Sequence, residues 1–112
     1  MKKVKPKKTA KFTEKFLNKL IEAATTDAYT ESEQVSGFFT LIEDNLVVPF
    51  TTRVLGQLVT VTGIDVTESD QIVAICMFAN TVQAIPILDL PMPAPLPEGV
   101  EWIAAYRRWC GS

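Results

Sequence analysis

Residues 51–64 read TTRVLGQLVTVTGI, and this stretch decides what kind of fold the chain can adopt. Threonine and valine dominate it, and polar and apolar residues partly alternate, a pattern typical of half-buried β-strands. Gly56-Gln57 divides the stretch and is a credible hairpin turn. We therefore predict two antiparallel strands, Thr51 to Leu55 and Leu58 to Ile64.

Two more strands are predicted downstream of this hairpin. The run from Gln71 to Phe78 is almost continuously apolar, Ala79-Asn80-Thr81 forms a turn, and Val82 to Leu88 follows. Four short strands in so short a stretch are typical of a small, highly curved antiparallel sheet or barrel. Alternating prolines from Pro91 to Pro97 predict an extended strap over the domain.

Helical periodicity replaces strand periodicity upstream of the sheet. Apolar residues recur at spacings of three to five between Phe12 and Ala24, which predicts a first helix. Thr30-Glu31-Ser32-Glu33 fits the capping box that opens a helix. An apolar stripe from Val35 to Leu46 follows, and Pro49 ends this second helix by about Val48.

A last helix is predicted to start at Pro97. Glu98 and Glu101 would occupy its first turn, and Arg107 and Arg108 its last turn, in accord with the helix macrodipole. The expected fold class is α+β, with N-terminal helices packed on a small, curved antiparallel sheet and with a C-terminal helix. We expect residues 12–112 to form a single domain.

The charge of the chain is divided between two segments. Residues 1–19 contain eight lysines and one acid, a net charge of +7, whereas the other 93 residues contain three arginines and twelve acids, a net charge of −9. Residues 1–11 show no hydrophobic period and are predicted to be a disordered Lys-rich arm. Lysines can contact nucleic-acid phosphates or an anionic membrane. The arm has no arginine or aromatic residue and precedes an acidic body, so we interpret it as a solubilising tail without a specific nucleic-acid or membrane partner.

Composition excludes several kinds of chemistry. The chain has no histidine, so it has no His-based triad and no His-containing zinc or haem site. Two cysteines cannot form a four-thiolate zinc site or an iron–sulfur cluster. The five glycines are too dispersed for a phosphate-binding loop. We therefore expect a protein that is not an enzyme, and the lack of a long apolar run predicts a soluble, cytoplasmic one.

Carboxylates gather in two clusters, and the downstream cluster is the stronger candidate for a metal site. Asp44, with Glu43 and Asn45, lies at the end of the second predicted helix, where free carbonyl oxygens could join carboxylates around Ca²⁺. Asp65, Glu68 and Asp70 could complete the shell if the sheet folds back. The alternative is a solvated helix face, because Asp44 lies opposite the apolar stripe.

The upstream cluster consists of Asp27, Glu31 and Glu33. Thirteen helical residues separate Glu31 from Asp44, about 20 Å, so one ion cannot use both clusters. Glu31 and Glu33 could equally serve the helix dipole and the capping box, and Asp27 could be a turn residue. Neither cluster matches the EF-hand pattern.

Six segments of the chain carry a family resemblance. The chain resembles small bacterial calcium-binding proteins of the type described from cyanobacteria in the segments Asp27 to Gln34, Gly37-Phe38, Glu43 to Phe50 (EDNLVVPF), Val59 to Ile64, Ile85 to Leu90 and Glu101 to Trp109 (EWIAAYRRW). The resemblance implies a compact α+β fold with an SH3-like curved sheet and non-EF-hand calcium sites. It implies Asp44 as the main ligand, with Glu43 and Asn45 beside it, and a second, weaker site at Asp27, Glu31 and Glu33.

The sequence thus predicts a non-enzymatic calcium-binding protein, a buffer or weak sensor, with Ca²⁺ as the ion and Mg²⁺ as a possible substitute. The rival hypothesis is a protein- or RNA-interaction module that uses the curved sheet and whose carboxylates bind no metal.

Overall fold

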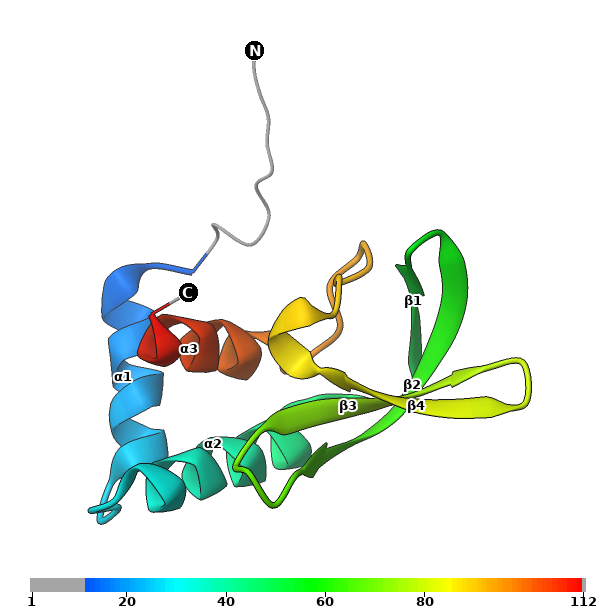
Figure 1. The fold of residues 1–112 in the computed structure, drawn as a ribbon. Helices are drawn as coiled ribbons and strands as arrows, with labels where there is room; N and C mark the ends of the chain where they lie inside the picture. The colour runs from blue at the N-terminus through cyan, green and yellow to red at the C-terminus, as the bar shows by residue number, and fades with distance from the viewer. Residues whose placement is uncertain (1–11, 112) are drawn as a thin grey trace.

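The sheet has four antiparallel strands in the order β1-β2-β3-β4 (Figure 1). A computed structural model of the chain describes residues 12–111. The strands are β1 (Phe50–Val54), β2 (Gln57–Val66), β3 (Ile72–Phe78) and β4 (Thr81–Pro86). All four predicted strands are therefore confirmed. The prediction of a disordered arm at residues 1–11 lies outside the described residues.

The first hairpin turns one residue earlier than predicted. Val54 pairs with Gln57, so Leu55 and Gly56 form the turn. Their φ angles are +51° and +79°, and a two-residue turn with positive φ at both positions matches the twist of the flanking strands. The sequence pattern pointed to Gly56-Gln57 because leucine rarely adopts a positive φ.

A bulge bends the sheet in its middle. The register between β2 and β3 shifts between Val61, which pairs with Cys76, and Gly63, which pairs with Ile75. An extra residue on one strand increases the local twist and bends that strand. The two hairpins consequently diverge as they leave the helices (Figure 1). This is the curvature that the sequence predicts.

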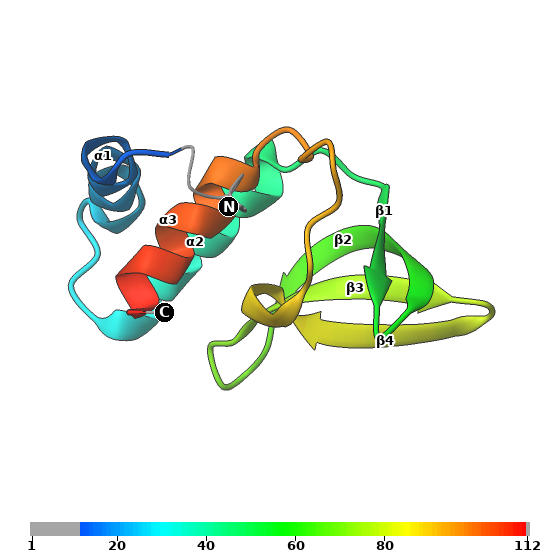
Figure 2. The same cartoon turned by 90° about the horizontal axis from the view of Figure 1, so that it is seen from above.

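Three α-helices lie to one side of the sheet. They are α1 (Glu14–Thr25), α2 (Glu31–Asn45) and α3 (Val100–Cys110). α2 and α3 run side by side in opposite directions, and α1 crosses the end of this pair (Figure 2). The α+β class is confirmed, and α2 makes the most extensive helix contact with the sheet, through β2, whereas α1 packs mainly on α2 and α3.

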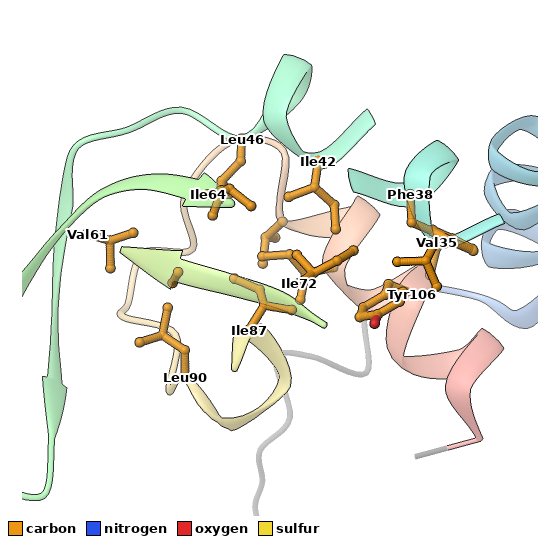
Figure 3. Close-up of a cluster of buried hydrophobic side chains, with 14 of the residues drawn as sticks. Val35, Phe38, Ile42, Leu46, Val61, Ile64, Ile72, Ile87, Leu90 and Tyr106 are labelled. Carbon is orange, nitrogen blue, oxygen red and sulfur yellow. The ribbon is translucent and has the colours of Figure 1, made fainter. Parts of the chain in front are cut away.

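The core lies between α2, α3 and the inner face of the sheet (Figure 3). Phe38 and Ile42 of α2 are fully buried and face Ile72 of β3. Phe38 also packs on Tyr106 and Trp109 of α3, with ring centroids 5.4 and 5.2 Å apart. Fully burying a side chain of this size contributes about 1.5–3 kcal/mol, so the stripe on α2 holds helices and sheet together.

One helix boundary agrees with the prediction and one differs from it. α2 ends at Asn45, within the limit of about Val48 that Pro49 sets. α3 begins at Val100, because Gly99 has a φ of +94° and cannot be part of a helical turn. Glu98 therefore lies outside the helix, in the connection that precedes it.

Between β4 and α3 the chain forms a short 3-10 helix (Ile87–Asp89) and then the proline-rich strap. Thr52, a buried polar residue of β1, donates a hydrogen bond of 2.6 Å to the carbonyl oxygen of Pro91. Arg107 of α3 donates one of 2.9 Å to the carbonyl oxygen of Leu88. These two bonds fix the first part of the segment against both the sheet and α3.

Candidate functional site

The downstream acidic residues lie at the C-terminal end of α2, as predicted. Glu43, Asp44 and Asn45 form its last turn, are all exposed, and have no basic residue among them. In residues 12–111 the one ion pair is Arg108 with Glu14, at 3.7 Å, so neither Glu43 nor Asp44 is paired there. Both carboxylates therefore face the negative end of the helix dipole without a compensating cation.

The amide of Asn45 already has a partner. Its Nδ2 atom donates a hydrogen bond of 2.8 Å to the carbonyl oxygen of Leu41, one turn earlier in the helix. An amide nitrogen carries no lone pair for a cation, so Oδ1 is the atom that could bind one. Asn45 can contribute one oxygen without breaking this bond.

The backbone of a further acidic residue, Glu98, reaches this end of α2 from a distant part of the sequence. The amide of Val47 donates a hydrogen bond of 2.9 Å to the carbonyl oxygen of Glu98. Gly99 also lies against Asn45, where an added Cβ would overlap the backbone carbonyl of Asn45. Glu98 was not predicted at this site, because the sequence pattern places this residue in the first turn of the last helix, whereas α3 begins at Val100. The glycine directly after it was the available signal that the chain leaves helical geometry there.

We call Glu43, Asp44, Asn45 and Glu98 the α2 C-terminal cluster. All four side chains are exposed. They offer hard oxygen donors, which suit Ca²⁺ or Mg²⁺ rather than softer metals.

The upstream residues serve the start of α2. Thr30 Oγ1 accepts from the amide of Glu33, and Glu33 Oε1 accepts from the amides of Thr30 and Tyr29 at 3.1 and 2.7 Å. This is the predicted capping box. The bonds from Tyr29 and Thr30 lower the pKa of Glu33 below its ordinary value. The carboxylate of Glu33 is thus already engaged, whereas that of Glu31 is exposed in the first turn.

Asp27 and Asp70 both occupy turns. Asp27 has a φ of +61° between α1 and α2, a conformation that aspartate tolerates better than most residues. Asp70, with a φ of +63°, accepts a hydrogen bond of 3.2 Å from Ser32 Oγ. The expectation that Asp70 completes a shell around Asp44 is therefore wrong, because the β2–β3 loop docks at the opposite end of α2.

The described carboxylates do not converge on one point. Within residues 12–111 no group of three His, Cys, Asp or Glu side chains is placed to hold a metal ion. Burial raises the pKa of the Cys76 thiol, which makes it a poor nucleophile. The arrangement can attract a cation at the surface, and it offers no activated acid, base or nucleophile.

The outer face of the sheet is a second candidate site. Leu58, Met77 and Val82 lie on the face turned away from Val61 and Cys76, and their exposed fractions are 55, 39 and 59 %. Met77 pairs directly with Val82. Residues 71–88 contain no charged side chain. The hairpin of β3 and β4 therefore presents apolar side chains without a charge of its own.

No protein-family model, curated protein or solved structure matches this chain. Nor does the described part of the chain contain a helix with the length and apolar character needed to cross a membrane.

Proposed function

We propose that the protein binds Ca²⁺ weakly and without catalysis at the α2 C-terminal cluster, as a buffer or weak sensor. One observation carries the proposal: Glu43 and Asp44 stand together, exposed and without an ion-pair partner in residues 12–111, at the negative end of α2. Carboxylates in this position cost about 0.3–1 kcal/mol each. A bound cation would offset that cost.

The ligands would be oxygens only. Ca²⁺ takes six to eight oxygens at about 2.3–2.6 Å, and carboxylates, helix-end carbonyls and water can all supply them. Asp44 and Glu43 are the proposed charged ligands, Asn45 adds its Oδ1, and Glu98 stands on the neighbouring segment. Few charges and an exposed surface predict an affinity of about 10⁻⁴–10⁻³ M, and Mg²⁺ can compete.

The residues that carry the resemblance to bacterial calcium-binding proteins support the same site, because EDNLVVPF begins at Glu43. A second, weaker site at Asp27, Glu31 and Glu33 would have to draw on Glu31 and Asp27, since Glu33 caps α2. We therefore place the first site at Asp44.

The test is a calcium titration of chelator-treated protein followed by amide chemical shifts. We expect saturable shifts at residues 43–46 and 98. Asp44→Asn, which removes one charge and keeps the shape, should weaken binding roughly tenfold. At ten times Kd, calcium should also stabilise the fold by about 1.4 kcal/mol, measured as a rise in Tm.

Glu68→Gln is the matched control, because Glu68 is an exposed acid in the β2–β3 loop. It should leave the titration unchanged. The proposal fails if 10 mM Ca²⁺, a concentration about ten times the weakest expected Kd, shifts no amide at this end of α2. Equal effects of Asp44→Asn and Glu68→Gln would contradict it as well.

A second candidate function, a protein-interaction module, is favoured by the exposed Leu58, Met77 and Val82 on the outer face of the sheet. The partner would be a protein rather than RNA, because this face offers Arg53 as its nearest cation and RNA binding relies on phosphate contacts. In this second candidate function, the carboxylates of the protein would bind no metal.

Val82→Glu tests this second candidate by placing a charge on the outer face. We expect any protein captured by the full chain to be lost with Val82→Glu and retained with Gln83→Glu, the neighbouring exposed position on the other face. Capture should also survive a calcium chelator. Equal capture by both variants would contradict a role for this face.

A further inference from the structure

A cleft of about 480 Å³ opens between α1, α3 and the proline-rich strap. Apolar side chains form most of it, and the ones that matter here are Phe12, Leu17, Met92, Leu96 and Ile103. Clefts of this size and composition are typical of sites for small organic molecules.

A second cleft, of about 730 Å³, follows the segment Leu88–Leu96 and shares Met92, Leu96 and Arg107 with the first. Arg107 therefore stands where the two clefts meet. A chain-like molecule could extend along both.

Two arginines give the apolar cleft a positive charge. Arg107 and Arg108 both line it, and the described residues contain only five basic side chains against thirteen acids. Arg108 is partly engaged, because its Nε donates a hydrogen bond of 2.8 Å to Asn18 and its NH2 atom lies 3.7 Å from Glu14. Arg107 has no carboxylate within ion-pair distance among residues 12–111. Its bond to the Leu88 carbonyl uses one of the five N–H groups of the guanidinium.

We propose that this cleft binds a small amphipathic anion, one with an aliphatic chain and a terminal carboxylate. The chain would lie on Leu17, Met92 and Leu96, and the carboxylate would accept hydrogen bonds from Arg107 and Arg108. A guanidinium matches a carboxylate in geometry as well as charge. This function goes beyond calcium binding, and its two arginines lie near the C-terminal end of α3, whereas Glu98 of the α2 C-terminal cluster precedes the start of that helix.

Charge argues against the lysine-rich N-terminus as the occupant. Residues 1–11 carry six lysines and lead directly into Phe12 at the cleft. Two arginines would repel that segment, whereas they would attract an anion. An apolar molecule without charge would form no charge-assisted hydrogen bond with either guanidinium.

The test is a titration of the full chain with decanoate, a ten-carbon carboxylate, followed by amide chemical shifts in a calcium chelator. The chelator prevents calcium from binding at the α2 C-terminal cluster, so the titration does not depend on the proposed calcium site. It also prevents calcium decanoate from precipitating. We expect saturable shifts along α3 and at Met92 and Leu96, with a Kd of about 10⁻⁵–10⁻⁴ M. Decanol, which has the chain without the charge, should bind roughly tenfold more weakly.

Three variants make the test specific. Arg107→Gln keeps an N–H donor for Leu88 and removes the charge, and should weaken decanoate binding roughly five- to thirtyfold. Arg107→Lys should restore part of that loss. Ala104→Phe, a half-exposed lining position, should block the cleft and abolish binding. Arg53→Gln is the control, because Arg53 lines a separate hollow on the other side of Met92 and does not line this cleft, and it should leave the affinity for decanoate unchanged.

Each remaining outcome overturns the proposal. Equal binding of decanoate and decanol would mean that the arginines do not recognise the charge. Binding unaffected by Ala104→Phe would place the ligand elsewhere, and no shifts at 1 mM decanoate, about ten times the weakest expected Kd, would mean that the cleft takes no such ligand.

Discussion

The carboxylate of Glu33 accepts two backbone hydrogen bonds at the start of α2, and these bonds lower its pKa. A carboxyl group with a lowered folded-state pKa stabilises the protein above its unfolded pKa and loses that contribution as the pH falls through the folded value. Glu33 should therefore support α2 at neutral pH and stop doing so in acid.

The variant Glu33→Ala tests this effect. It should lower Tm at pH 7, and the difference from the parent protein should shrink as the pH falls below the ordinary value of 4.5. Thermal unfolding at several pH values measures it. Glu22→Ala, an exposed acid on α1, is the control and should show no such trend. A Tm difference that stays constant between pH 7 and pH 3, a span that covers ordinary carboxyl pKa values, would contradict the assignment.

Residue-level prediction succeeded where the contacts are local. The capping box of Thr30 and Glu33 spans three positions, so the sequence shows both partners at once. Glu98 and Asp70 reach α2 across gaps of about fifty and forty residues, and no spacing rule connects such positions. The candidate site was therefore predicted at Glu43, Asp44 and Asn45, and its neighbour Glu98 was not.

At the scale of elements, α1 and α2 meet at Gly37. A Cβ added there would overlap the carbonyl oxygen of Ala24, a buried residue near the end of α1. The periodicity of α2 shows which face is apolar, but it cannot show that another backbone approaches this position. The close contact of α1 with α2 is thus a feature that only the structure reveals.

Gly37→Ala measures how tightly this contact is packed. Alanine in a helix interior normally stabilises by about 1 kcal/mol over glycine. Here we expect a net loss of about 1–3 kcal/mol, because the two helices must move apart. Denaturant unfolding at equilibrium gives this value. Ser36→Ala, an exposed neighbour, should stay within about 0.5 kcal/mol of the parent protein. A more stable Gly37→Ala protein would refute the close approach.

At the scale of the whole molecule, charge and apolar surface are separated. The described residues carry thirteen acids and five basic side chains, yet the strands β3 and β4 carry no charge and the arginine pair lies beside the apolar cleft. The sequence predicted four strands and three helices because each has a strong local period. It could not predict which helix makes most of the contact with the sheet, because that arrangement depends on contacts between positions far apart in the chain, such as the close approach of Gly37 to Ala24.

The length of α2 also determines how strongly cations bound at its two acidic ends would interact. Glu31 and Asp44 lie about 20 Å apart along a single rigid helix, and the Debye length at physiological salt is about 8 Å. The field of a cation held at one end has largely decayed before it reaches the other. Two cations bound to this helix would therefore bind independently of each other. The binding curve at one end would be a simple hyperbola, whether or not the other end is occupied.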